Sequence, residues 1–402
     1  MTALAWQHCS RAPRAAVALA LIGIVTSLAD PAAALAQGTL SDQGFGYPPG
    51  QLSTRALGSA GALGESDPVS PINPAVLSAW GRGGIFFQYA PEFTAVTAGG
   101  ETDHLTTTRF PLIAAAVRVG ARTMLGISSS TFLARNFSTS NTVQQTLPGG
   151  GTVNTTTSLT STGAANDVRL AGSYVPSRGR VSLGLGLHVF TGQNRVNVTA
   201  DVVDPTNTSG TNPFLQVNEN RRLSFSGIGL SGGVQWRPLP SLLLSASGRH
   251  GGTLRLNAGD TLISRARIPD RVGGSVVYDG ISGTTLVARV NWEKWSNIDG
   301  LGSAAVRTFD ATEYSVGADV AGPRLPGNRL VMLRVGARTR TLPFSAAGAE
   351  VSETAYAAGF GVPLAGDRAV FDFAAQRAAR SADGVGTSER AWTLGIGFTV
   401  RP

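Results

Sequence analysis

After residue 80, the connections between the patterned segments of this chain alternate between long and short. The long ones are Gly/Ser/Thr-rich segments at residues 91–107, 133–163, 200–220, 258–268, 296–312, 342–353 and 381–388. The short ones are turns at residues 120–121, 176–179, 238–240, 280–283, 322–327 and 365–367. A closed membrane β-barrel shows this asymmetry, because one rim carries tight turns and the other carries long loops. Seven long and six short connections predict fourteen strands.

The segments between these connections alternate with a period of two residues. In residues 392–400, apolar side chains occupy every second position, and Thr or Gly occupies the others; residues 181–190 and 286–293 repeat the pattern. A helix would repeat its apolar positions every three or four residues. We therefore expect strands with one face toward lipid and one toward the interior. A soluble sandwich or propeller would also alternate, but it gives no reason for loop lengths to alternate strictly.

The composition favours the barrel over other classes. Charged residues make up 14% of the 402 residues, whereas soluble proteins carry about 25%. The body of the chain has no apolar run of about 20 residues, which a transmembrane helix needs. Residues 37–80 are rich in Gly, Pro, Ala and Ser, alternate little, and are long enough to enter a lumen. The predicted fold class is an all-β, closed antiparallel transmembrane β-barrel of about 14 strands with an N-terminal plug.

The N-terminus has the layout of a secretory signal. Arg11 and Arg14 precede an apolar stretch from Ala15 to Ala29, and Ala34-Leu35-Ala36 provides a small-x-small cleavage site. A membrane anchor is the competing interpretation, but the stretch is short. We expect export to the outer membrane, cleavage near Ala36, and three parts: a signal peptide (1–36), a plug (37–80) and the barrel (81–402).

The cysteine and arginine content limits which cofactors and partners the protein can have. The single cysteine, Cys9, precedes the apolar stretch and leaves with the signal, so the mature chain has no disulfide and no cysteine metal site. We expect no cofactor. The net charge is +8 and is almost entirely due to arginine, but no basic cluster is interleaved with aromatics as in nucleic-acid binding. The arginines are expected to pair with lipopolysaccharide phosphates at the rim or to line the lumen of a monomer in outer-membrane lipid.

Several charged residues of neighbouring strands point inward in the predicted register. They are Arg289, Glu293, Asp319, Arg334, Arg338 and Asp372. One interpretation is a charge network that fills the barrel and holds the plug. The other is that one or two arginines bind a ligand carboxylate, since a guanidinium matches a carboxylate bidentately. On the second hypothesis, replacing Arg334 and Arg338 by Ala reduces uptake without loss of the folded barrel.

Gly229-Leu-Ser231-Gly-Gly233 matches the nucleophile-elbow pattern of serine hydrolases. His188 and His250 lie on the two strands that flank Ser231, which would allow a lipase-like activity. Alternation points His188 and Ser231 inward and His250 outward, whereas a triad needs its base and nucleophile within hydrogen-bond reach. The sequence shows no metal-ligand spacing either. We predict that the protein is not an enzyme.

Three patches of the sequence resemble the long-chain fatty acid transporter (FadL) family. The segment from Leu57 to Ala75 resembles the family's hatch, with Asn73, Pro74 and Ala75 matching its Asn-Pro-Ala signature. Residues 268–295 resemble its central hairpin, and residues 342–356 resemble a late extracellular loop. The resemblance covers most of the chain in layout but is specific only in these patches, and the family's ligand-binding residues cannot be placed.

This resemblance implies a fourteen-stranded barrel, plugged at its N-terminus, that binds hydrophobic molecules and releases them sideways through an opening at a strand kink. The kink cannot be located from the sequence. The implied function is passive uptake of fatty acids or aromatic hydrocarbons, with the segments 133–163 and 200–220 as the capture surface. A barrel that serves as a scaffold or shuttle in a surface-protein secretion system is the alternative, and a polar porin is a third.

Overall fold

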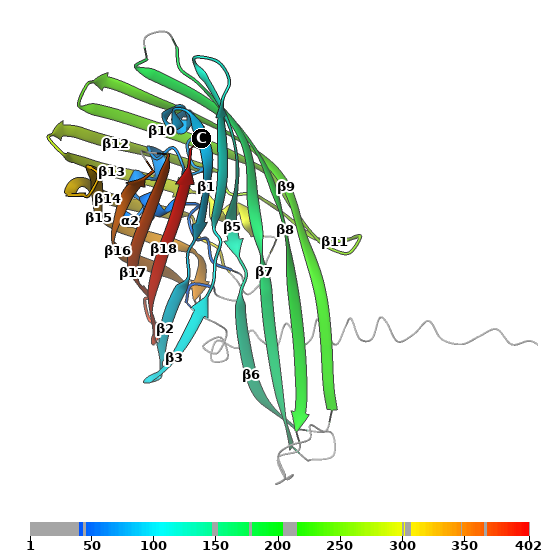
Figure 1. Cartoon of the computed structure of the whole chain (residues 1–402). Coiled ribbons are helices and arrows are strands. Elements are labelled where there is room, and N and C mark those ends of the chain that lie inside the picture. The colour runs from blue at the N-terminus through cyan, green and yellow to red at the C-terminus, as the bar shows by residue number, and fades with distance from the viewer. Residues whose placement is uncertain are drawn as a thin grey trace, which may run out of the picture.

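In the computed structural model, eighteen strand segments form one sheet that closes on itself. The residues described are 40–42, 46–146, 152–176, 179–203, 215–299, 301, 307–346, 348–365 and 368–401. The predicted signal peptide and its cleavage site near Ala36 lie outside them. The first and last segments, β1 and β18, pair antiparallel from Ile85↔Val400 to Tyr89↔Ile396. This pairing closes the barrel (Figure 1).

The first nine segments are β1 (Gly83–Tyr89), β2 (Glu92–Ala98), β3 (Glu101–Thr107), β4 (Leu112–Arg118), β5 (Thr123–Ala134), β6 (Phe137–Thr146), β7 (Thr152–Tyr174), β8 (Val181–Val203) and β9 (Leu215–Leu239). The others are β10 (Leu242–Ala258), β11 (Thr261–Arg267), β12 (Arg271–Ile281), β13 (Thr284–Glu293), β14 (Ala311–Leu325), β15 (Arg329–Ala346), β16 (Ala349–Leu364), β17 (Ala369–Ala382) and β18 (Thr387–Val400). Four pairs of segments are collinear. β1 and β2 both pair with β18, β5 and β6 both pair with β7, and β11 and β12 both pair with β10. β4 and β3 are collinear because they pair with β1 and β2 respectively. Eighteen segments therefore make fourteen barrel strands, as predicted.

The alternation places side chains as the sequence predicts. On β8, Leu183, Leu185 and Leu187 are exposed on the outer face, whereas Ser182 and His188 are buried inside. Apolar side chains exposed on the outside of a closed sheet are stable only against lipid. No helix among the described residues is long and apolar enough to span a membrane.

The predicted long loops are largely strand. Residues 91–107 form the hairpin of β2 and β3, and residues 133–163 and 200–220 include β6 and the outer parts of β7, β8 and β9. The prediction of loops was wrong there, because Thr is β-branched and favours strands even where the sheet is solvated. Hydroxyls pair across β6 and β7, for example Thr142 Oγ1 with Thr156 Oγ1 at 2.9 Å. Figure 1 shows these strands extending beyond the rest of the barrel.

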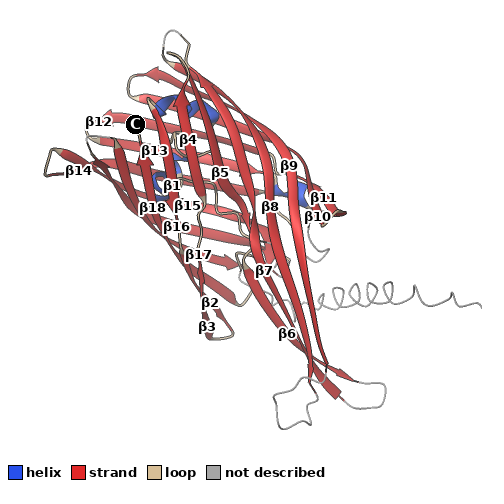
Figure 2. Ribbon diagram, turned by 45° about the vertical axis from the view of Figure 1, so that its right-hand side comes forward, coloured by secondary structure: helices blue, strands red, loops and turns tan. Residues whose placement is uncertain are grey.

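The N-terminal segment, residues 46–80, lies inside the barrel and is called the plug below (Figure 2). It contains a short helix α2 (Thr54–Gly58) and two 3₁₀ turns, η2 (Ala62–Glu65) and η3 (Pro74–Trp80); a further turn, η4 (Trp295–Ile298), follows β13. Ser53 caps α2 by accepting from the Ala56 N–H, and Asn73 caps η3 by accepting from the Ala75 N–H at 3.0 Å. Pro74 occupies the first position of η3, where a missing N–H costs nothing. The Asn-Pro-Ala signature is thus a capped turn.

Inward-facing glycines let the plug approach the wall closely. A Cβ on Gly184 would overlap the backbone of Pro74 and Ala75, and one on Gly336 would overlap Ser59. A Cβ on Gly233 would overlap the side chain of Asn73. The plug therefore rests against bare backbone on several strands, which leaves no room for a layer of water.

Candidate functional site

A network of buried charges joins the plug to the inner wall. Arg334 pairs with Asp319 at 3.2 Å and with Asp372 at 2.5 Å, and Arg338 pairs with Glu353 at 2.9 Å. The plug enters the network through Arg55, which pairs with Asp319 at 3.0 Å, and through Glu65, which pairs with Arg271 and Arg289. A buried charge is tolerated when it is paired and hydrogen-bonded.

The predicted lumen residues all lie inside the barrel, but they do not form one site. Arg289 and Glu293 line a small cavity of about 40 Å³ on one side of the plug. Arg338 lines a second cavity of about 40 Å³ on the other side, while Arg334 and Asp372 belong to the network beneath the plug. Ligand contact by these residues stays a prediction.

Tyr47 forms one end of a short strap, residues 46–52, that crosses the lumen. Its hydroxyl donates to Glu353 at 3.1 Å and accepts from Arg340 at 2.5 Å and Arg380 at 2.9 Å. The guanidinium groups of Arg380 and Arg109 lie over its ring, 4.6 and 5.0 Å from the centroid. Burial raises the pKa of the Tyr47 phenol, so the hydroxyl keeps its proton and serves as the donor to Glu353.

Gln51 forms the other end of the strap. Its amide nitrogen donates to Ser130 at 2.7 Å and to Asp167 at 2.9 Å, and its amide oxygen accepts from Arg249 at 3.1 Å. Gln51 has a backbone φ of 51°, which a residue with a side chain adopts only when its surroundings hold it there. The strap is thus fastened to both sides of the wall.

Asp167, His188 and Ser231 form a buried chain of hydrogen bonds behind Gln51. His188 Nδ1 lies 2.8 Å from Asp167 Oδ1, and His188 Nε2 lies 2.8 Å from Ser231 Oγ. The sequence predicted that His188 and Ser231 point inward, but it missed both their contact and Asp167. Ser231 is only 7% exposed, lies within the ladder between β8 and β10, and lines none of the cavities described here. This chain of hydrogen bonds connects Gln51 to β7, β8 and β9.

A buried aromatic cluster lies beside the cavity that Arg289 and Glu293 line. Phe132 and Trp295 also line that cavity and stack with ring centroids 5.2 Å apart, and Phe190 and Phe344 pack edge-on against them. Arg249 covers the rings of Phe132 and Phe190 at 5.5 and 5.6 Å. Together with the plug, this cluster leaves little open volume, so the structure is a closed state of the lumen.

The barrel wall has a break beside the strap. Pairing between β4 and β5 ends at Leu112↔Ser130, followed by a hydrogen bond from the Thr131 N–H to the Pro111 carbonyl at 3.0 Å. Beyond this point β3 pairs with β2 and β6 pairs with β7, and no ladder joins β3 to β6 in the described part of the chain. The strap reaches this break, because Tyr47 exchanges two backbone hydrogen bonds with Ala134, the last residue of β5.

The level of the break follows from the outward-facing residues. On β7 these residues change from apolar (Leu170 and Val168) to polar (Asn166). Asn166 is the ladder partner of Thr131, the residue at which the break begins. The break therefore begins at the outer edge of the apolar band and opens toward the rim of the long hairpins. The sequence alone did not locate this interruption of the strands.

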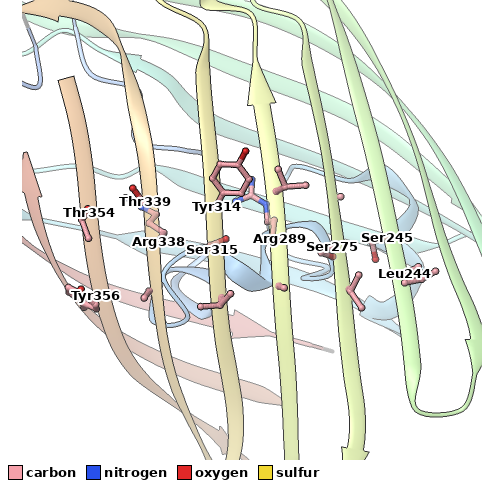
Figure 3. Close-up of a pocket in the computed structure, with 16 residues that line it drawn as sticks. Leu244, Ser245, Ser275, Arg289, Tyr314, Ser315, Arg338, Thr339, Thr354 and Tyr356 are labelled. Carbon is pink, nitrogen blue, oxygen red and sulfur yellow. The ribbon is translucent and has the colours of Figure 1, made fainter. Parts of the chain in front are cut away.

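A separate hollow of about 830 Å³ lies on the outer face of the wall, across β10 and β12–β16. Figure 3 shows its lining residues side by side on adjacent strands, among them Tyr314, Thr339 and Tyr356. Its outward-facing members, such as Val316 and Tyr356, are 57% and 66% exposed. This hollow faces lipid and is not part of the lumen.

Comparison with known proteins gives matches of fold. No protein-family model matches the chain, and no curated protein sequence matches it. Among solved structures, the CymD monoaromatic hydrocarbon channel is 14% identical, with 92% of this chain and 98% of that chain covered and a TM-score of 0.50. The Pseudomonas putida toluene transporter TodX is 11% identical, with coverages of 87% and 98% and a TM-score of 0.51. In its fold, the chain is a barrel of the FadL type, as the sequence patches predicted.

Proposed function

We propose that the protein takes up hydrophobic small molecules, such as aromatic hydrocarbons or fatty acids, across the outer membrane by passive diffusion. The observation that carries this proposal is the strap between the two small cavities. Gln51 lines both cavities; the aromatic cluster borders the first, and the second is lined by Arg109 and Pro111 at the wall break. Displacing the strap would join the cavities into a path from the lumen to the break.

The chemistry of the path fits an apolar or amphipathic molecule. Phe132 and Trp295 offer aromatic surface at one end of the first cavity, while Arg249 and Arg289 offer guanidinium groups that would meet a carboxylate. A molecule that leaves by the break enters the outer edge of the apolar band, where it need not cross the plug. We propose a monomer that needs no cofactor and is surrounded by outer-membrane lipid and lipopolysaccharide.

A comparison of solute uptake by cells that lack this protein and cells that express it distinguishes transport from other roles. We expect expression to raise the initial uptake of radiolabelled toluene or oleate several-fold and to leave the uptake of a disaccharide unchanged. Equal stimulation of the disaccharide would indicate a polar porin. No stimulation of any solute, with the barrel folded in the outer membrane, would contradict the proposal.

Replacing Gln51 by Ala tests the strap. The variant loses the three side-chain hydrogen bonds to Ser130, Asp167 and Arg249, each worth about 0.5–1.5 kcal/mol. The strap is then displaced more often, so we expect faster hydrophobic uptake, measured with the same labelled solutes. Gln144→Ala, on the solvated part of β6, is the matched control; equal uptake in the two variants would argue against a gating strap.

A further inference from the structure

Two arginines point outward from the wall at the level where the apolar band ends. Arg377 on β17 and Arg390 on β18 are both exposed. In the ladder, Arg377 pairs with Trp392, and Ala379 pairs with Arg390. The two arginines are therefore diagonal neighbours, about 7–8 Å apart at the backbone and within reach of one another's long side chains.

Neither arginine forms an ion pair within the described part of the chain, in contrast to Arg380, the inward-facing arginine of β17. Arg377 instead lies over the ring of Trp392, 5.9 Å from its centroid. A Trp at this level is typical of the aromatic girdle at a membrane interface. The pair thus presents two uncompensated positive charges at the headgroup level on the long-hairpin side, which is the outer leaflet.

The lipid-facing hollow adjoins this pair. Tyr356 lines the hollow and is the ladder partner of Arg377. From Tyr356, one row of outward-facing residues continues through Ala337 and Val316 to Ala288. The floor is low at Ala337 and Ala288, which carry small side chains, and Val316 lies between them in the same row. Gly274, in the neighbouring row with Tyr314, adds no side chain.

A second row of outward-facing residues in the hollow, two residues nearer the outer rim along each strand, is more polar. It runs through Tyr314, Thr339 and Thr354, which are ladder partners. The hollow therefore offers hydroxyl groups on its rim side and apolar surface on its membrane side, next to two guanidinium groups. An amphipathic molecule with an anionic head and an acyl chain matches this order.

We propose that this part of the outer wall is a specific binding site for the lipid A part of lipopolysaccharide. Arg377 and Arg390 bind its phosphate, because guanidinium groups donate two parallel hydrogen bonds to phosphate oxygens. An acyl chain lies in the hollow over Ala337 and Ala288, and the hydroxyl groups of Tyr314 and Thr339 face the sugar. This site is on the opposite face of the wall from the lumen and does not depend on the uptake function.

The test counts lipid bound to the purified barrel by native mass spectrometry during titration with lipid A in detergent. We expect one lipid A per wild-type barrel and at least a tenfold weaker affinity in the double variant Arg377→Gln/Arg390→Gln. Ala337→Phe fills the hollow with an apolar ring and should weaken binding similarly while both charges remain. Arg118→Gln removes an exposed charge from the opposite rim and should bind as wild type does.

Varying the lipid distinguishes a specific site for the lipid A phosphate from nonspecific attraction of any lipid to the barrel. Lipid A without its phosphates should bind to wild type as weakly as lipid A binds to the double variant. Undiminished binding in the double variant, or equal binding of phosphatidylglycerol and lipid A, would overturn the proposal. Each variant's folded state is checked by its heat-modifiable mobility in electrophoresis, and Arg377→Lys/Arg390→Lys, which keeps the charge, should bind more tightly than the Gln variant.

Discussion

A single methyl group at position 184 should unseat the plug. In Gly184→Ala the new Cβ would overlap the backbone of Pro74 and Ala75, which cannot move aside as a flexible side chain would. Overpacking of this kind costs about 1–3 kcal/mol, and 1.4 kcal/mol changes a population about tenfold. We therefore expect the undocked plug to become roughly five- to a hundredfold more frequent, with a matching rise in ion conductance across planar bilayers.

The chain offers a close control for this substitution. Gly233 and Gly232 are neighbours on β9 but face opposite sides of the wall. A Cβ on Gly233 would overlap Asn73 of the plug, whereas a Cβ on Gly232 would have no neighbour nearer than 3.9 Å. Gly233→Ala should conduct like Gly184→Ala, and Gly232→Ala should stay closed. If all three variants conduct alike, the plug is not held by these contacts.

Removing the charge of Glu353 should cause the largest loss of stability. Its carboxylate is fully buried and binds Arg338 at 2.9 Å and Arg340 and Arg380 at 2.7 Å, besides accepting from Tyr47. Glu353→Gln keeps the shape but leaves three buried guanidinium groups undercompensated. Breaking a buried ion pair costs about 3–5 kcal/mol, so we expect a clear fall in the temperature at which the heat-modifiable folded band is lost.

Glu350 provides the comparison on the same strand. It is exposed near the start of β16, and removal of an exposed charge changes stability by at most about 1 kcal/mol. Glu350→Gln should therefore unfold at the wild-type temperature. An equal loss in both variants would mean that the net charge of the strand matters rather than the buried network.

The wall was predictable because its signals are local. Alternation with a period of two residues fixes which face of a strand meets lipid, so Arg334 and Arg338 could be directed inward without knowledge of their partners. The interruptions of the strands also leave a trace in the sequence. Pro91, Pro111 and Pro269 lie at three of the four breaks, where a residue without an N–H cannot continue a ladder.

The contacts of the strap could not be predicted in the same way. Tyr47 and Gln51 lie in a segment without periodicity, and their partners come from β5, β7, β10, β15, β16 and β17. Asp167 meets His188 only because β7 and β8 pair in a particular register, which no single strand encodes. Such contacts depend on the closed barrel, so a pattern within one segment carries no information about them.

The partners of the N-terminal residues lie far along the chain, which predicts an order of assembly. Tyr47 bonds to Glu353, 306 residues later, and Ser41 bonds to Glu389, 348 residues later. Both carboxylates lie on the last three segments, and β18 is also the strand that closes the wall against β1. Contacts between such distant residues form late, because their loop-closure entropy must be overcome first. We therefore expect the contacts of Tyr47 and Ser41 to form only after β16 and β18 are in place, at the stage when β18 pairs with β1 and closes the wall.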